Sequence, residues 1–145
     1  MLRNMTGSIC ILDGDCKEYS NDKNRILILP GEKSPEEFIF NYSQKLYDVD
    51  DKIWGNEYLI DEGYTKRKYQ TSILPEILQN EKKDKNKRSG RKEIFKKYNT
   101  FFCFLFENWL KQEKNQDEIQ KFSVGLKNSF KKVANFNNID PNIWK

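Results

Sequence analysis

The pattern of apolar and polar positions predicts two short strands near the beginning of the sequence. Residues 8–12 read Ser-Ile-Cys-Ile-Leu, and residues 25–29 read Arg-Ile-Leu-Ile-Leu. Short continuous apolar runs of this kind are typical of strands that are buried on both faces. A crossover through the polar residues 16–23 would make the strands parallel, although this connection is short for a full helix. The carboxyl ends of both strands would then meet at one edge of a small sheet.

A helix is predicted over residues 35–47, directly after the second strand. Ser34 is a suitable N-cap, Pro35 suits the first helical position, and Glu37 completes a capping box. The acidic residues at this helix start also fit a purely structural role, because carboxylates stabilise the positive end of a helix. Apolar residues follow at helical spacing, at Phe38, Ile39, Tyr42 and Leu46.

Helical spacing dominates the second half of the sequence. Apolar positions over residues 91–109 predict a long helix with a break near residues 99–100. A second helix is predicted over residues 116–133. We expect the two helices to form an antiparallel hairpin through residues 111–115.

These segments divide the chain into three consecutive parts. Residues 1–80 are expected to form an α/β segment with a small parallel sheet and flanking helices. Within this part, residues 48–80 predict only short helices and loops. Residues 81–92 are strongly basic and read as a solvated, mobile linker, and residues 93–145 form the helical segment.

Composition narrows the chemistry that the chain can perform. The 145 residues include no histidine, which excludes Ser-His and Cys-His nucleophile systems and histidine-containing zinc sites. A net charge of +4 permits a nucleic-acid partner. Three cysteines without CxxC spacing indicate a reducing compartment, and we expect Cys10 and Cys103 in the core. Because no segment is apolar enough for a signal peptide or a membrane span, we expect a cytoplasmic protein without membrane contact.

Asp13-Gly14-Asp15, at the end of the first strand, is the strongest candidate for chemistry. Two carboxylates one residue apart converge on a small volume, and like charges so close are costly unless a cation lies between them. Gly14 would allow a sharp backbone turn. The pattern therefore predicts a Mg²⁺ or Mn²⁺ site at Asp13 and Asp15. A solvated turn is an equally open interpretation, because Asp and Gly are ordinary turn residues.

The order of these motifs resembles a known family. A strand, Asp13-Gly14-Asp15, a second strand, Pro30-Gly31 and then Ser34-Pro35-Glu36 are similar to the later half of a TOPRIM domain. The similarity is in particular to the nuclease part of the OLD-family (overcoming lysogenization defect) ATP-dependent endonucleases, and it is most specific over residues 8–46. It implies an α/β fold with a partial TOPRIM-like parallel sheet, followed by the C-terminal helical hairpin. It also implies metal-dependent hydrolysis of phosphodiester bonds in DNA.

The resemblance implies a metal-binding role for four residues. Asp13 and Asp15 would bind a divalent cation, and Ser34 and Glu36 would contribute to a second metal position. Two metals about 4 Å apart can activate a water and stabilise the leaving oxygen of a phosphodiester. This chemistry needs no histidine.

The resemblance also implies a role for the basic residues at the start of the helix predicted over residues 91–109. The family uses a lysine in catalysis, which we assign here to Lys92, although Lys87, Arg91 or Lys96 could serve instead. The basic run would follow the phosphate backbone of DNA. Its assigned DNA contacts are Lys87, Arg88 and Arg91.

One departure from the family predicts that the chain is part of a larger assembly. TOPRIM domains carry an essential glutamate after an earlier strand, and the residues before Ser8 leave no room for that strand. We therefore expect an upstream portion with the ATPase and the first TOPRIM strand as partner. The isolated chain should then be oligomeric or poorly soluble, and weakly active. The alternative is a non-catalytic interaction subunit of an ATPase assembly.

Overall fold

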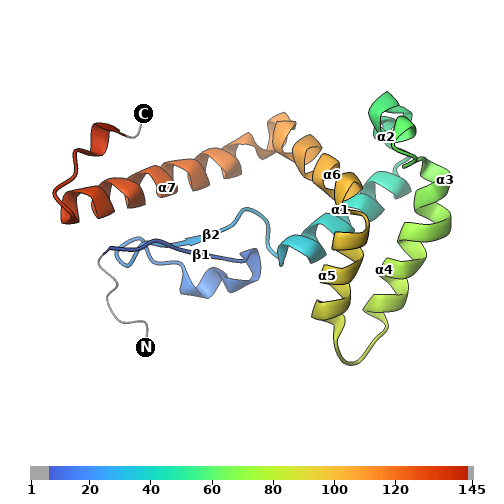
Figure 1. Ribbon diagram of the computed structural model, residues 1–145, viewed down its shortest axis with the longest axis horizontal. Coiled ribbons are helices and arrows are strands. Elements are labelled where there is room, and N and C mark those ends of the chain that lie inside the picture. Colours follow the sequence, from blue (N-terminus) through green and yellow to red (C-terminus); the bar gives the residue numbers. More distant parts are fainter. Residues whose placement is uncertain (1–6, 144–145) are drawn as a thin grey trace. The chain divides into compact units, whose positions relative to one another are not determined.

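The computed structural model describes residues 7–143, and the chain divides into two compact units (Figure 1). The first, here called the sheet unit, combines the described residues of Met1–Ser34 and Leu110–Lys145. The second, the helical unit, is the continuous segment Pro35–Trp109. These units group the chain differently from the three consecutive parts expected from the sequence, and that division remains a prediction.

The protein is mainly helical, and the expected α/β fold is wrong. Helices account for 70% of the structure, and the residues it describes contain one sheet of two strands, too small for the expected TOPRIM-like sheet. Apolar residues elsewhere recur at helical spacing and bury against other helices, as do Tyr69, Ile73 and Ile77. In the described part of the chain, the two segments that pair as strands are the apolar runs without that spacing.

The sheet unit contains two parallel strands, β1 and β2. The parallel pairing agrees with the crossover considered from the sequence, and a 3₁₀-helix, η1, begins the connection. The carboxyl ends of both strands therefore lie at the same edge. The bounds are Cys10–Leu12 for β1, Gly14–Tyr19 for η1 and Ile26–Ile28 for β2, with Cys10 opposite Ile26, Ile11 opposite Leu27 and Leu12 opposite Ile28.

Burial of the two strands is unequal. Ile26 and Leu27 of β2 are buried, whereas the Ile11 side chain of β1 is 47% exposed. The prediction that the first strand is buried on both faces is therefore wrong. Within the described residues, β1 pairs with β2 alone, so one edge of β1 and the Ile11 side chain are not covered by a further strand.

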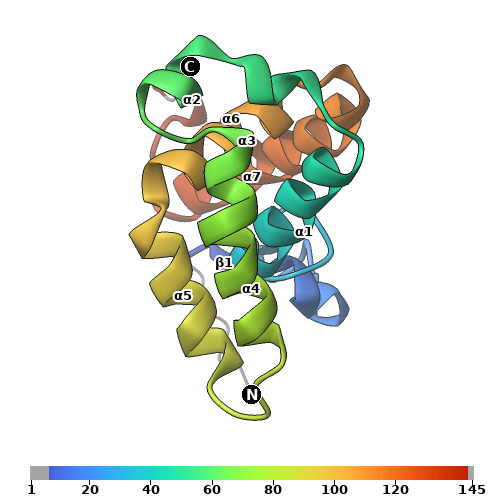
Figure 2. The ribbon, with the colours of Figure 1, turned by 90° about the vertical axis from the view of Figure 1, so that its right-hand side faces the viewer.

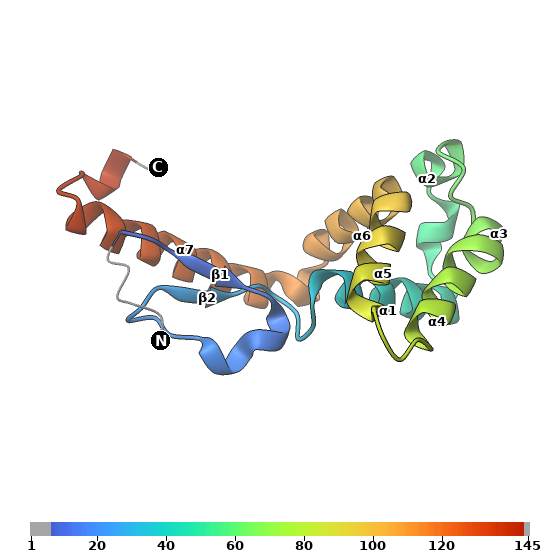
Figure 3. The same ribbon diagram turned by 60° about the horizontal axis from the view of Figure 1, so that its bottom comes forward.

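The long helix α7 (Gln116–Phe136) covers the sheet. Figures 1 and 3 both show it running alongside β2. Gly125 permits the close approach, because a Cβ at this position would lie 3.3 Å from Cδ2 of Leu27. Only two residues of α7 are buried, so the small sheet leaves much of the helix accessible to solvent. Two short 3₁₀ turns flank the helix, η4 (Glu113–Asn115) and η5 (Pro141–Ile143).

The helical unit begins with α1 (Pro35–Asp48), which confirms the helix predicted from residue 35. Figure 2 shows α4 (Leu74–Glu81) and α5 (Lys87–Lys97) side by side, joined by the loop of residues 82–86. A π-helical turn precedes α4 and continues directly into it, because the backbone at the junction stays in the right-handed helical region. The remaining elements up to α4 are η2 (Lys52–Gly55), α2 (Glu57–Asp61), α3 (Lys66–Lys68), η3 (Tyr69–Ile73) and α4 (Leu74–Glu81).

The predicted helices of the second half form, and they are divided between the two units. α5 (Lys87–Lys97) and α6 (Asn99–Lys111) are separated at Tyr98, next to the predicted break. The two helices of the expected antiparallel hairpin fall in different units, since the helical unit ends at Trp109 and α7 belongs wholly to the sheet unit, and the hairpin remains a prediction. Within the expected linker of residues 81–92, the last six residues form the beginning of α5.

The core of the helical unit surrounds Tyr69, whose side chain is fully buried. Its ring lies 5.1 Å from the Trp54 ring and 5.8 Å from the Phe101 ring, measured between centroids. Its hydroxyl pairs with Oγ of Ser43 at 2.8 Å, and Ser43 also donates to the carbonyl of Phe40. Burial raises the pKa of Tyr69 to about 12, so the phenol stays protonated.

Two expectations from composition can be compared with the structure. Cys103 is exposed on α6 and Cys10 is half-buried, so the prediction of two core cysteines is wrong. The reason is that α6 turns Phe101, Phe102 and Leu105 inward, which leaves Cys103 on another side of the helix. Among residues 7–143, no helix has the length and apolar character that crossing a membrane requires.

Substitution of Tyr69 by Phe tests the buried hydroxyl pair. We expect Tyr69→Phe to lower the free energy of unfolding by about 1 kcal/mol, because one buried hydrogen bond is removed while Ser43 keeps its bond to Phe40. Urea unfolding followed by tryptophan fluorescence measures this change. Tyr58→Phe is the matched control, because Tyr58 is 49% exposed, and it should change the value by less than about 0.5 kcal/mol. Equal values for both variants would contradict the prediction.

Candidate functional site

The Asp-Gly-Asp turn lies directly at the carboxyl end of β1. Asp13 has an extended backbone and precedes η1, and its carbonyl accepts a hydrogen bond from the Cys16 amide at 3.0 Å. Asp13 is half-buried and Asp15, in the first turn of η1, is exposed. The turn therefore presents one partly sheltered and one accessible carboxylate.

Gly14, between the two carboxylates, is held against the loop that follows β2. A Cβ at this position would lie 2.3 Å from the carbonyl oxygen of Gly31 and 2.9 Å from that of Lys33. No side chain larger than hydrogen fits such an approach of two backbones. The Asp-Gly-Asp turn and the Pro30-Gly31 loop thus meet at one edge of the sheet, as the parallel pairing predicts.

Two further contacts hold the loop after β2. Gly31 has a φ of +95°, which favours glycine, and its amide donates to Oε1 of Glu118 on α7 at 2.6 Å. Lys17 of η1 forms an ion pair with Glu32 at 2.8 Å. The hydrogen bond from Lys17 lowers the pKa of Glu32, but both side chains are exposed and the pair contributes little to stability. The sequence pattern does not indicate the Gly31–Glu118 and Lys17–Glu32 contacts. In the sequence, Glu118 is explained equally well as a carboxylate that stabilises the start of a helix.

The thiol next to the turn is a poor nucleophile. Desolvation and a contact with the Asp15 carboxylate, 3.6 Å from Sγ to Oδ1, raise the pKa of Cys16. The negative charges of nearby acidic residues act in the same direction. A thiolate is therefore disfavoured here, and the chemistry available at this turn is that of the carboxylates.

The four predicted metal ligands are divided between the two units. Asp13, Asp15 and the buried Ser34 belong to the sheet unit, and Glu36 lies in the first turn of α1 in the helical unit. Across residues 7–143, no group of three or more Cys, Asp or Glu residues is arranged to hold a metal ion. The turn by itself supplies two carboxylates, so the four-residue metal site remains a prediction.

The predicted cationic residues all lie on α5. Lys92 and Arg88 are exposed, and Lys87 is half-buried, with its carbonyl accepting from the Asn80 side chain at 3.0 Å. Arg91 is different, because its side chain is only 17% exposed. The helix therefore offers accessible cations beside one that is largely enclosed.

Arg91 joins three helices of the helical unit. Its Nε and one terminal nitrogen each donate to Glu81 of α4 at 2.8 Å, and the other terminal nitrogen donates to Glu37 of α1 at 2.9 Å. The hydrogen bond from Arg91 lowers the pKa of Glu81, and the same bond raises the pKa of the guanidinium. These bonds use three of the five N–H groups of Arg91 and hold its side chain on two carboxylates. The sequence pattern indicates only a helix-start role for Glu37.

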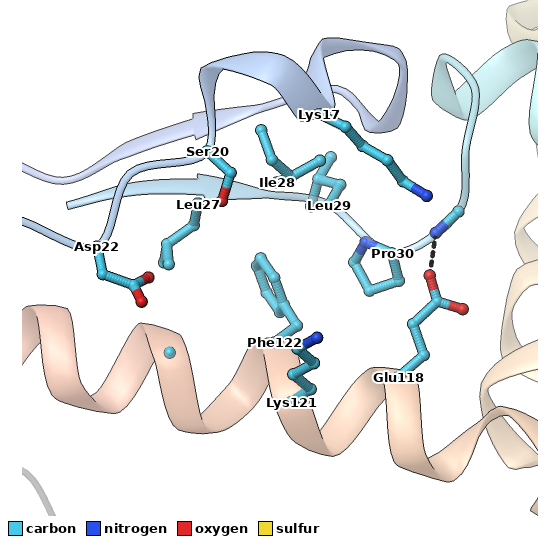
Figure 4. Close-up of a pocket in the computed structure, with 12 residues that line it drawn as sticks. Lys17, Ser20, Asp22, Leu27, Ile28, Leu29, Pro30, Glu118, Lys121 and Phe122 are labelled. Carbon is cyan, nitrogen blue, oxygen red and sulfur yellow. Dashed lines mark hydrogen bonds between the residues drawn. The ribbon is translucent and has the colours of Figure 1, made fainter. Parts of the chain in front are cut away.

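A cleft of about 450 Å³ opens between β2 and α7 in the sheet unit (Figure 4). A second hollow of about 440 Å³ adjoins it and shares Asp22, Lys121 and Gly125 with it. We call the two connected hollows together the β2–α7 cleft. The lining of the first hollow includes Lys17, Asp22, Leu27, Pro30, Lys121 and Phe122, and that of the second includes Lys131 and Lys132.

Comparison with known proteins identifies no relative. No protein-family model, no curated protein and no solved structure matches the chain.

Substitution of Gly14 tests the contact between the turn and the loop. We expect Gly14→Ala to destabilise the sheet unit by about 1–3 kcal/mol, because the new methyl group overlaps the Gly31 backbone and the loop must move. Chemical unfolding measures the loss. Gly7→Ala, in the same unit, is the control, because a Cβ there meets nothing within 4 Å. A Gly14→Ala protein as stable as the control would show that the two backbones are not held together.

Substitution of Arg91 tests the joint between the three helices. Arg91→Met should cost about 2–3 kcal/mol, less than for fully buried pairs because the Glu37 and Glu81 side chains are 26% and 34% exposed. Lys92→Met, on the exposed side of the same helix, should change stability by less than about 0.5 kcal/mol. Urea unfolding at pH 7 compares them.

The pH dependence of this difference is a second readout. The lowered pKa of Glu81 contributes stability above the ordinary glutamate pKa, and that contribution is lost as the pH falls through the lowered value. The difference between the wild type and Arg91→Met should therefore shrink at acidic pH. A difference that is independent of pH would assign the loss to packing alone.

Proposed function

We propose that the chain is the nuclease part of an OLD-like, ATP-dependent DNA endonuclease and acts in the cytoplasm. In this proposal the Asp13–Asp15 turn binds Mg²⁺ or Mn²⁺ for phosphodiester hydrolysis. The observation that carries the proposal is the contact of Gly14 with the loop after β2. This contact holds the backbone of Gly14 in place between Asp13 and Asp15. The turn lies at the carboxyl end of β1, and open parallel sheets bind their ligands at the carboxyl ends of their strands.

The donor set of the turn suits the proposed cation. Carboxylate oxygens are the ligands that Mg²⁺ prefers, and Mg²⁺ is usually held by one or two carboxylates with waters and substrate phosphates completing its shell. Asp13 and Asp15 would hold the metal, with the Ser34 hydroxyl and Glu36 as further oxygen donors. When bound, the metal would lower the pKa of a water and stabilise the leaving oxygen.

The cations of α5 have separate roles in this proposal. Lys92 is exposed and would stabilise the negative charge that develops on the phosphate. Lys87 and Arg88 would contact the DNA backbone. Arg91 is bound to two carboxylates, so we assign it chiefly to positioning α5, which carries the other three residues.

The proposal includes an upstream portion with the ATPase as partner. Within residues 7–143, one edge of β1 has no strand beside it and Ile11 is exposed, and both observations support this part, because a strand with a free edge accepts a strand from another chain. The same observation favours a second candidate function, that of a non-catalytic interaction subunit. The two candidates differ in whether the Asp13–Asp15 turn binds metal.

Metal binding and DNA cleavage test the proposal. Asp13→Asn and Asp15→Asn should each weaken Mn²⁺ binding at least about tenfold in isothermal titration calorimetry, because each removes one of few charged ligands. Asp117→Asn on α7 is the control and should bind like the wild type. The chain alone should cleave supercoiled plasmid weakly with Mg²⁺. Addition of the ATPase-bearing portion should raise the rate, and Asp15→Asn and Lys92→Ala should abolish the gain.

Three outcomes would contradict the proposal. Mn²⁺ binding that is unchanged in both Asn variants would remove the metal site and favour the interaction subunit. Cleavage that survives Asp15→Asn would belong to a contaminant or to another site. Strong cleavage by the isolated chain, abolished in Asp15→Asn, would keep the metal chemistry but reject the need for a partner.

A further inference from the structure

The β2–α7 cleft carries a row of lysines that neither the metal site nor α5 explains. Lys121 and Lys132 are eleven residues apart on α7, which is three helical turns to within about 20° and spans about 16 Å. Both side chains are exposed and line the connected hollows, together with Lys131. Lys121 and Lys132 therefore lie on one side of α7, and Lys131 is turned about 100° from Lys132 around the helix.

The acidic residues at the cleft are largely engaged. Glu118 accepts from the Gly31 amide, and Glu32 is paired with Lys17. Asp22 is the acidic side chain that points across the cleft toward α7 (Figure 4). Its carbonyl accepts from Nζ of Lys132 at 3.0 Å. Across the two connected hollows, Lys121, Lys131 and Lys132 therefore face two carboxylates, those of Asp22 and Glu118, while Lys17 is already paired with Glu32.

The lining of the cleft is apolar between these charges. Leu27 and Pro30 come from the strand side, and the Phe122 ring extends from α7 toward them (Figure 4). An aromatic ring beside cations spaced along a groove is the arrangement that binds single-stranded nucleic acid, with a base on the ring and phosphates on the cations. A lipid headgroup would use the cations alone, and an acidic peptide would not need the ring.

We propose that single-stranded nucleic acid binds in the β2–α7 cleft, with its phosphates on Lys121, Lys131 and Lys132 and a base against Phe122. This inference rests on the proposed function and extends it, because it identifies a substrate-binding surface within the sheet unit itself. The cleft is lined by the loop after β2, the same loop that contacts the Asp13–Asp15 turn through Gly14. A strand bound in the cleft would therefore lie next to the proposed metal site.

Binding of a fluorescein-labelled twelve-nucleotide oligo-dT to the full chain tests the proposal. Fluorescence anisotropy in EDTA separates binding from cleavage. The double variant Lys121→Gln/Lys131→Gln should weaken binding about tenfold at 50 mM salt. It should also reduce the slope of log K against log salt by about 1.4, or about 0.7 for each phosphate that no longer has a lysine beside it. The control is Lys114→Gln/Lys127→Gln, which removes the same charge from exposed positions outside the cleft.

Two further variants separate the cleft from a general effect of charge. Asp22→Asn should strengthen binding, because it removes the carboxylate that faces the cleft. Phe122→Leu keeps an apolar side chain but removes the stacking surface, and it should weaken binding about tenfold without changing the salt slope. Circular dichroism and the unfolding midpoint confirm that each variant is folded.

The outcomes distinguish this proposal from the proposed nuclease function. If the cleft variants weaken oligo-dT binding in EDTA and the protein shows no cleavage in Mn²⁺, the result would support binding in the cleft and count against the nuclease function. Cleavage that is unaffected by the cleft variants would overturn the cleft while leaving the nuclease. Two further outcomes would overturn the proposed binding in the cleft. One is an equal loss of affinity for oligo-dT in the two double variants, and the other is binding to phosphatidylserine vesicles but not to oligo-dT.

Discussion

A parallel pair of three-residue strands is too small to be stable alone in water, so the sheet unit depends on the packing of α7 against β2. In this packing Leu27 lies against Gly125 of α7 and is buried, whereas Ile11 on the other strand is exposed. Gly125 allows the close approach, and Glu118 fixes the loop after β2 by accepting from Gly31. The loop in turn contacts Gly14 between the two proposed metal ligands. The position of the Asp13–Asp15 turn is therefore linked to the helix through one short loop.

The helical unit is held together in another way. Its interior is a continuous aromatic core around Tyr69, and Arg91 joins three helices through charged hydrogen bonds that stay largely out of water. Burial of a paired cation gives α5 a defined orientation, which determines the side on which Lys92 is exposed. The candidate metal ligands Asp13 and Asp15 thus depend on a small sheet, whereas the candidate catalytic residue Lys92 depends on a well-packed helical core.

Much of the local structure could be predicted from the sequence. The apolar runs before Asp13 and Pro30 indicate the strands, Pro35 indicates the start of α1, and both features follow from local chemistry alone. The fold class could not be predicted in this way. The length of a strand and the number of its neighbours depend on what packs against it. The sequence pattern around Ile11 is the same whether this side chain is buried or exposed.

The candidate site was predictable only in part. Asp13, Gly14 and Asp15 form a local pattern, and the parallel strands bring them to the loop after β2. Arg91 shows the limit, because a guanidinium in a basic run looks available until its partners Glu37 and Glu81, 54 and 10 residues away, are known. The lysines of α7 show the same limit, since each fits an ordinary solvated helix face in the sequence. Only the tertiary structure shows that Lys121 lines a cleft.

The discontinuity of the sheet unit has a consequence for the order of folding. The Gly31–Glu118 bond joins residues 87 positions apart, and closing a flexible loop of that length costs about 4 kcal/mol in chain entropy before any contact stabilises it. The helical unit is one continuous segment and meets no such barrier, so it can fold first. Once it has folded, the connection between Ser34 and Leu110 is no longer a flexible chain, and the remaining search is shorter. Mutations in the aromatic core around Tyr69 should then slow the assembly of a sheet that they never touch.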